Sequence, residues 1–236
     1  MTDGGWLGAQ RTRSRPTEDL LEGLCRTCVR EAGVDGACLS IVTGDGSPEP
    51  VHATDELSER LGDLQFTLGE GPCVDASRTG RPVLVPDLAA TSPGIWPQFG
   101  AGADAAGLRA VFALPLQVGG IRLGVLDLYR HTAGALSREQ LAGALSFAGA
   151  ATQLLLDLQA QDTALGIPPP HALAVLDDRA EVHQATGVVS VRAGVSLAQA
   201  LALLRARAYA EDRPIGDLAR DVLDGLVQIE ENDDHD

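Results

Sequence analysis

The sequence has no lysine and few aromatic residues. All 18 basic residues are arginine, against 33 acidic residues, so the 236-residue chain carries a net charge of −15. This charge excludes a protein that coats nucleic acid or anionic membrane by bulk attraction, and a polyanionic partner would have to meet a local cluster of arginines. Aromatic residues make up 3% of the chain, and Tyr209 is the only one after residue 170.

Long apolar runs and export signals are also missing. No apolar run reaches the ~18 residues that a membrane-spanning helix needs, and no apolar segment follows the arginines at positions 11, 13 and 15 to make a secretion signal. Four cysteines without an export signal indicate reduced thiols in the cytoplasm. Cys25 and Cys28 have helical spacing and no second ligand pair nearby, so we expect small buried apolar side chains and no metal site.

The first 165 residues predict one α/β domain with an antiparallel sheet flanked by helices. Apolar spacing predicts a helix over 17–32 with Thr17 as its N-cap, and Ser137 is expected to cap a long helix that reaches about residue 165. Two strand-like segments joined by Gly119 and Gly120 have the signature of a hairpin. The other predicted segments are strands at 37–43 and near 51–54, a helical turn or two over 55–61, a short helix opened by Pro72, an extended piece at 81–87 and an irregular stretch at 91–108.

After a proline-rich break the pattern becomes purely helical. Three amphipathic segments, 171–192, 196–210 and 214–229, predict a small three-helix bundle with Leu197 and Leu226 turned inward. Residues 171–228 hold eight acidic residues and six arginines, a net charge of only −2. The expected division is a disordered tail (1–16), an α/β domain (17–165), a linker (166–170), an all-α domain (171–229) and an acidic tail (230–236).

Several motifs of the first domain resemble those of a GAF domain between Thr17 and Leu158. They are ACLSIVT (37–43), LGEGPCVDA (68–76), RPVLVPDL (81–88) and the hairpin RAVFALPLQVGGIRLGVLDLY (109–129). The resemblance implies a sensor or dimerisation module, in which the loop at 69–73 and the stretch at 91–108 border a small-molecule pocket. Cys73, Trp96 and Phe99 are then candidate pocket residues, with core packing as the equal alternative. No cyclic-nucleotide motif, haem-ligand histidine or bilin cysteine can be assigned, so the sequence names no cofactor.

The helical module resembles an ANTAR domain from Leu173 to Val227. The matching segments are RAEVHQATGVV (179–189), GVS (194–196), ALALLRARAY (200–209) and PIGDLARDV (214–222). The resemblance implies that the module binds RNA hairpins and blocks transcription terminators. Many members have a lysine where this chain has Thr186, so arginine, tyrosine and amide groups would have to carry the contacts.

Tyr209 is the best candidate for stacking on an unpaired RNA base, because two arginines lie beside it in sequence. The alternatives are that Tyr209 packs at the edge of the bundle, that Arg205 pairs with Glu211 or Asp212, and that His183 lies in a dimer interface. The full candidate RNA-binding set is Arg179, His183, Gln184, Thr186, Arg192, Arg205, Arg207 and Tyr209.

Catalytic motifs are absent from the sequence. No P-loop, H-E-x-x-H or G-x-S-x-G occurs, and the acidic residues Asp75, Asp87 and Asp127 are interpreted as solvated loop carboxylates. The leading hypothesis is therefore a non-enzymatic bacterial regulator in the cytoplasm, a homodimer joined along the helix from Ser137, that binds RNA hairpins and contacts no membrane. The alternatives are a DNA-binding regulator, which the acidic surroundings of Arg220 argue against, and a protein-interaction scaffold.

Overall fold

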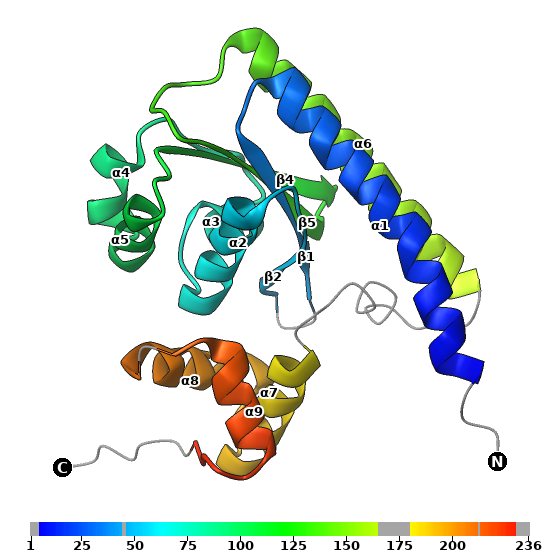
Figure 1. The fold of residues 1–236 in the computed structure, drawn as a ribbon, viewed down its shortest axis with the longest axis vertical. Coiled ribbons are helices and arrows are strands. Elements are labelled where there is room, and N and C mark those ends of the chain that lie inside the picture. Colours follow the sequence, from blue (N-terminus) through cyan, green and yellow to red (C-terminus); the bar gives the residue numbers. More distant parts are fainter. Residues whose placement is uncertain (1–4, 44–45, 165–179, 212, 230–236) are drawn as a thin grey trace. The chain divides into compact units, whose positions relative to one another are not determined.

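The computed structural model describes residues 5–43, 46–164, 180–211 and 213–229. The chain divides near residue 178 into two compact units, each with its own core (Figure 1). The predicted linker at 166–170 and the acidic tail at 230–236 lie outside the described residues. The boundaries between the parts of the chain therefore stay predictions.

The first unit is built on a five-stranded sheet in which every neighbouring pair is antiparallel. The predicted hairpin is confirmed: its two strands pair from Ala110–Arg130 to Val118–Ile121, and Gly119 in the turn has a positive φ of 58°. In spatial order the strands are β2 (Pro48–Ala53), β1 (Gly36–Val42), β5 (Ile121–Arg130), β4 (Ala110–Val118) and β3 (Val83–Val85).

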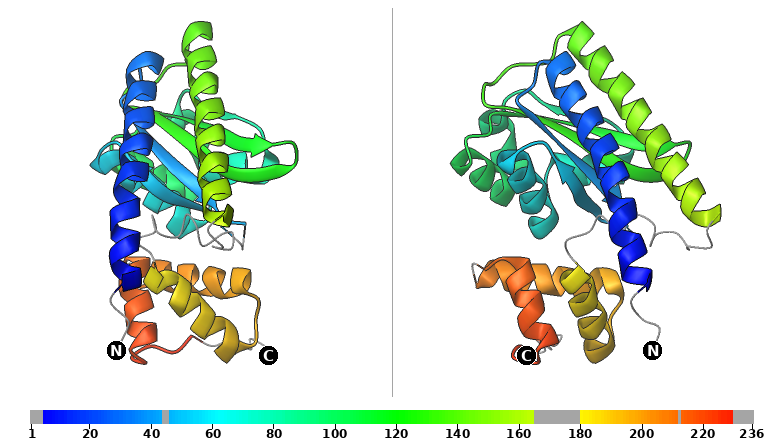
Figure 2. Two further views of the ribbon diagram at one scale, coloured as in Figure 1. Left: turned by 90° about the vertical axis from the view of Figure 1, so that its right-hand side faces the viewer. Right: turned by 45° about the vertical axis from the view of Figure 1, so that its right-hand side comes forward.

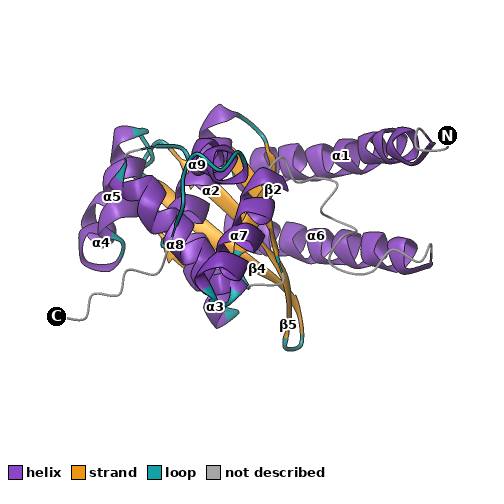
Figure 3. Ribbon diagram, turned by 90° about the horizontal axis from the view of Figure 1, so that it is seen from below, coloured by secondary structure: helices purple, strands orange, loops and turns teal. Residues whose placement is uncertain are grey.

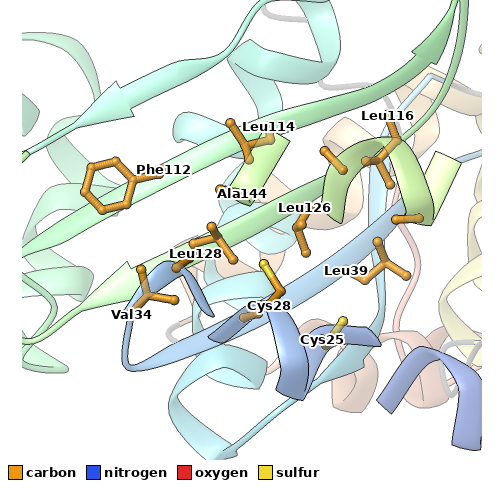
Figure 4. Close-up of a cluster of buried hydrophobic side chains, with 14 of the residues drawn as sticks. Cys25, Cys28, Val34, Leu39, Phe112, Leu114, Leu116, Leu126, Leu128 and Ala144 are labelled. Carbon is orange, nitrogen blue, oxygen red and sulfur yellow. The ribbon is translucent and has the colours of Figure 1, made fainter. Parts of the chain in front are cut away.

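Two long antiparallel helices, α1 (Gly5–Ala32) and α6 (Arg138–Ala164), lie side by side on one face of the sheet (Figure 2). Cys25 and Cys28 of α1 point into the core between this layer and the sheet (Figure 4). Both thiols are fully buried and unbridged, and desolvation raises the pKa of each to about 12. They are small apolar core residues, as the sequence predicts.

The two long helices differ in how well the sequence predicts them. Ser137 caps α6 as expected: its Oγ accepts from Gln140 N at 3.1 Å, and Gln140 Oε1 accepts from Ser137 N at 2.9 Å. Helix α1, by contrast, begins at Gly5, so residues 5–16 are helical and Thr17 lies inside the helix. The regular spacing of apolar residues begins at Leu20 and Leu21, which put the predicted cap at Thr17.

Helix α6 is also long and apolar enough to span a membrane. Its segment Arg138–Ala160 has a mean hydropathy of 1.4, and helices α7 and α8 pass the same test only as a pair bent by 107°. The sequence holds no uninterrupted apolar run of this length, and α6 passes the test through its mean hydropathy because alanine and leucine fill much of it. Its buried face (Ala144, Ala148, Ala151 and Leu155) packs in the core with α1 and the sheet.

The opposite face of the sheet is covered by short helices. The stretch 91–108, expected to be irregular, instead contributes to two adjacent helices (Figure 3). Asp87 Oδ1 accepts from Ala90 N at 3.4 Å to start the first, and Pro97 occupies the first turn of the second. The helices of this layer are α2 (Glu56–Leu68), α3 (Pro72–Thr79), α4 (Leu88–Ile95) and α5 (Pro97–Ala105).

The second unit contains α7 (Ala180–Ala193), α8 (Leu197–Ala210) and α9 (Ile215–Leu223). Ser196 and Gln199 form the predicted cap of α8. Helix α9 ends six residues before the expected Ile229, where Asp224 is followed by Gly225 at a φ of 74°. Leu197 and Leu226, both predicted to face inward, are 55% and 74% exposed. Leu197 is the first residue of α8 and Leu226 lies beyond α9, so neither continues a buried helical stripe.

Candidate functional site

A buried polar cluster lies between the sheet and the short helices of the first unit. Asp127 of β5 is fully buried, and its Oδ2 accepts a hydrogen bond from Gln65 Nε2 of α2 at 3.0 Å. Gln65 Oε1 accepts from Cys73 N in the first turn of α3 at 2.7 Å. The Cys73 thiol in turn lies 3.8 Å from Ser40 Oγ of β1. These four residues, here called the Asp127 cluster, join two strands to two helices.

The charge state of the cluster follows from its burial. Desolvation raises the pKa of Asp127 to about 7. Desolvation, together with the neighbouring Asp127 carboxylate, raises the pKa of the Cys73 thiol well above its usual value. Among the described residues, Asp127 Oδ1 has no hydrogen-bond partner. The cluster therefore holds a neutral thiol beside a carboxyl group that can gain or lose a proton near neutral pH.

The interpretation of Asp127 as a solvated loop carboxylate is wrong. Asp127 pairs with Cys38 and Ala113 in the middle of the sheet. A signal was present in the sequence: the aspartate interrupts the apolar segment GVLDLY of a predicted strand, on the same side as Val125 and Tyr129. Acidic residues are rarely buried without a specific partner, so its position in a central strand marks an unusual site.

Two carboxylates from the LGEGPCVDA segment hold the start of α5. Glu70 Oε1 accepts from the backbone N–H groups of Gln98 and Phe99, each at 2.8 Å. Asp75 Oδ2 accepts from the indole N–H of Trp96 at 3.0 Å. Because a helix N-terminus has unpaired donors and a partial positive charge, Glu70 acts as a remote N-cap of α5.

The three candidate pocket residues are all buried. Trp96 and Phe99 meet edge to face with ring centroids 6.3 Å apart, whereas Cys73 packs in a small apolar cluster with Ala113 and Val125. The structure therefore brings Trp96 and Phe99 together and places Cys73 at the Asp127 cluster. The described residues include no group of side chains suited to hold a metal ion.

The candidate RNA-binding residues differ in how far they are exposed. His183, Gln184, Arg192 and Tyr209 are exposed on α7 and α8, and the exposed fraction of Tyr209 is 57%. Thr186 is only 6% exposed, and its Oγ1 donates to the carbonyl of Val182 at 2.7 Å, so its hydroxyl is bonded within α7. Arg205 is half-buried, Arg207 is exposed, and Arg179 lies outside the described residues.

Carboxylates engage three arginines of the second unit. Arg207 Nε lies 2.6 Å from Glu211 Oε1. Arg213 bridges Glu211 at 3.3 Å and Asp221 at 2.6 Å, and these two carboxylates hold the pKa of Arg213 above its usual range. Glu211, one of the two carboxylates considered as an alternative partner for Arg205, pairs with Arg207 and Arg213.

The third of these arginines, Arg220, is the only arginine of α9. It joins Glu181 of α7 at 3.0 Å and also pairs with Asp217. Both Arg213 and Arg220 thus connect segments of the bundle, and their guanidinium groups are already occupied by carboxylates.

Each of the two units matches a known protein family. Residues 14–155 match the GAF domain, which is more than half of the chain. The chain belongs to the GAF domain family. Residues 171–223 match the ANTAR domain, so the architecture is a GAF domain followed by an ANTAR domain, and both are regulatory rather than catalytic modules. No curated protein sequence matches the chain.

Solved structures support the fold of the GAF domain. A domain of a two-component sensor histidine kinase protein from Sinorhizobium meliloti 1021 is 16% identical with a TM-score of 0.54, covering 63% of this chain and 97% of its own. The GAF domain region of a membrane protein from Geobacter sulfurreducens PCA is also 16% identical with a TM-score of 0.52, covering 62% and 97%. At this identity the likeness shows the fold of the GAF domain alone.

Proposed function

We propose that this GAF–ANTAR protein is a cytoplasmic regulator that binds RNA hairpins through its ANTAR domain and prevents transcription termination, under control of its GAF domain. The observation that carries the proposal is the match of residues 171–223 to the ANTAR domain. The exposed His183, Gln184, Arg192 and Tyr209 support it, since hydrogen-bonding, guanidinium and aromatic groups recognise unpaired bases.

The alternative of a DNA-binding module has less support. A recognition helix presents several basic or amide side chains to the major groove. The only arginine of α9 is held by Glu181 and Asp217, and Asp217 and Asp221 add negative charge to the same helix. A helix with this charge would be repelled by duplex phosphates.

We propose that the GAF domain controls RNA binding by the ANTAR domain and that it acts through a homodimer. The outer sides of the paired helices α1 and α6 expose Leu20 and Leu145, which are 56% and 45% accessible. A second copy would cover them, and a signal received near Cys73, Trp96 and Phe99 would shift the balance between dimer arrangements.

Titration of the full chain against a labelled RNA hairpin and a DNA duplex of equal length, over a salt series, tests the RNA proposal. We expect hairpin binding with a shallow salt dependence, because few cations are left for phosphates. Replacement Tyr209→Ala should weaken hairpin binding by roughly tenfold, as expected for one lost base stack. Binding to the DNA duplex alone would refute the proposal, and binding to neither would favour a scaffold.

A further inference from the structure

A series of hydrogen bonds leads from Asp127 in the sheet to the first turn of α3. Asp127 Oδ2 accepts from Gln65 of α2, and Gln65 Oε1 accepts from the backbone N–H of Cys73, the second residue of α3. Gln65 is also packed tightly against the turn before α3, because a Cβ placed on Gly71 would lie 2.8 Å from Gln65 Oε1. A movement of the Gln65 side chain therefore displaces the first turn of α3.

The two carboxylates that hold α5 lie on either side of this turn in the sequence. Glu70 accepts from the backbone N–H groups of Gln98 and Phe99, and Asp75 accepts from the indole N–H of Trp96. The start of α5 thus keeps its place only while the first turn of α3 keeps its own.

The surroundings of Asp127 are poorly suited to a charged side chain. Asp127 is fully buried, and its Oδ1 has no hydrogen-bond partner among the described residues. Burial disfavours the charged form, and the hydrogen bonds with Cys73 and Gln65 offset this only in part, so the pKa of Asp127 is raised to about 7. A buried carboxylate with an unpaired oxygen is stabilised when water reaches it. Water reaches it when the helices that cover this face of the sheet move away.

The groups that face Asp127 from neighbouring elements do not titrate near neutral pH. Strand β4 presents Ala113 opposite Asp127, and α2 presents Gln65. Cys38, opposite Asp127 on β1, is a buried thiol. Burial, together with the Asp127 carboxylate, raises the pKa of Cys73 on α3 well above its usual value. Since buried thiols stay neutral, Asp127 is the group whose charge changes.

Two further titratable groups lie along the same side of β5. Tyr129 donates to Asp55 Oδ1 at 2.9 Å. Burial, followed by this hydrogen bond, raises the pKa of Tyr129, so the phenol stays neutral. Burial alone would raise the pKa of Asp55, but the hydrogen bonds that it accepts outweigh burial and lower it, so Asp55 stays charged. Neither group changes its charge near neutral pH.

We propose that the Asp127 cluster is a proton-dependent switch: when Asp127 gives its proton to solvent, α3 and the start of α5 move away from the sheet, and when Asp127 regains the proton they return. The open form hydrates the carboxylate and so binds fewer protons. Its population therefore rises about tenfold per pH unit where only the open form is ionised. This interval lies between the ordinary aspartate pKa of 3.8 and the value of about 7 in the closed form. The inference concerns the GAF domain alone and does not depend on RNA binding.

Hydrogen exchange in the wild-type full chain tests the switch. The backbone amides of Cys73, Gln98 and Phe99 report on it, as protection factors corrected for the pH dependence of chemical exchange. We expect these factors to fall at least tenfold from pH 5 to pH 8. Low urea concentrations should not accelerate the exchange, because a local opening exposes little surface. Constant protection, or a urea dependence as steep as that of the core residue Ala148 of α6, would overturn the proposal.

Two matched variants identify the group that titrates. Asp127→Asn keeps the shape of the neutral acid, so its protection factors should be equal at both pH values. Asp104→Asn makes the same change at an exposed carboxylate of α5 and should keep the pH dependence of the wild type. Equal pH dependence in the two variants would assign the effect to another group and overturn the proposal.

A second measurement needs no variant. The carboxyl carbon-13 resonance of Asp127 in the wild type follows its proton directly. Its titration midpoint should coincide with the pH at which the protection factors level off. A midpoint in the ordinary range of aspartate would overturn the proposal even if Asp127→Asn failed to fold.

Discussion

Gln65 connects the buried carboxyl group of Asp127 to the first turn of α3. Its Nε2 donates to Asp127 Oδ2 at 3.0 Å, and its Oε1 accepts from Cys73 N at 2.7 Å. Because Oδ2 is already an acceptor, the proton of the neutral acid belongs on Oδ1, which has no hydrogen-bond partner among the described residues. A change in the charge of Asp127 therefore alters the hydrogen bonds of Gln65. Through Gln65 it affects α2 and the segment that carries Glu70 and Cys73.

Replacement Asp127→Asn should remove a pH dependence of stability. The folded protein holds the Asp127 proton with a pKa of about 7 against an ordinary value of 3.8. The free energy of unfolding of the wild type should therefore fall as the pH rises from about 4 to about 7, by at most ~4 kcal/mol. Denaturant unfolding at pH 5 and pH 8 measures this. Identical pH dependence in both proteins would contradict the assignment.

Replacement Glu70→Ala should loosen the start of α5. The variant leaves the N–H groups of Gln98 and Phe99 without their shared acceptor, which costs about 1–2 kcal/mol for a lost helix cap. Hydrogen exchange at these two amides should accelerate, and the melting temperature should fall. The control Asp104→Ala changes an exposed carboxylate near the end of the same helix, so equal losses in both variants would contradict the capping role.

Two glycines should respond in opposite directions to alanine. A Cβ at Gly36 would collide with Asp55 Oδ2 and the ring of Tyr129, which belong to the hydrogen-bond network at the start of α2. Gly36→Ala should cost about 1–3 kcal/mol through overpacking. Gly23 lies inside α1 with nothing within 4 Å of the added atom, so Gly23→Ala should stabilise the protein by about 0.5–1 kcal/mol. Chemical denaturation of both variants measures the change in the free energy of unfolding. A Gly36→Ala protein as stable as the wild type would argue against the close packing at Gly36.

The parts of the fold that were predictable depend on local signals. The glycine turn at 119–120, the Ser137 cap and the Ser196 cap each act within a few residues, so sequence spacing identifies them. Helix α5 was missed because the acceptors that hold its start come from Glu70 and Asp75, more than twenty residues earlier. Helix α4 has a local cap at Asp87 but was missed because Pro93 and Gly94 inside it are typical of irregular chain. The Asp127 cluster joins residues of two strands and two helices that lie far apart in the sequence. The spacing of apolar residues within one element does not predict which elements meet.

Arg213→Ala should weaken the ANTAR domain without affecting RNA binding. Arg213 joins Glu211 and Asp221 and is about one-third exposed, so its loss should lower the free energy of unfolding, by an amount that solvent screening keeps small. Its guanidinium is occupied by carboxylates, and hairpin affinity should stay within about twofold of wild type. Denaturant unfolding and RNA titration measure the two quantities separately. A large loss of affinity in a folded Arg213→Ala protein would place the RNA near Arg213 and its partners Glu211 and Asp221.

Leu145→Glu should dissociate the proposed homodimer. The inner side of α6 fills the core through Ala144 and Ala148, whereas Leu145 is 45% exposed on the outer side. A charge there would have to be desolvated in a dimer seam but would stay hydrated in a monomer, so only the dimer is penalised.

The control Val118→Glu changes a side chain of similar exposure (48%) at the end of β4. Light scattering at micromolar concentration should show a dimer for the wild type and the control and a monomer for Leu145→Glu, with circular dichroism verifying the fold. A monomeric wild type would refute the dimer itself, and a dimeric Leu145→Glu protein would place the seam on another surface.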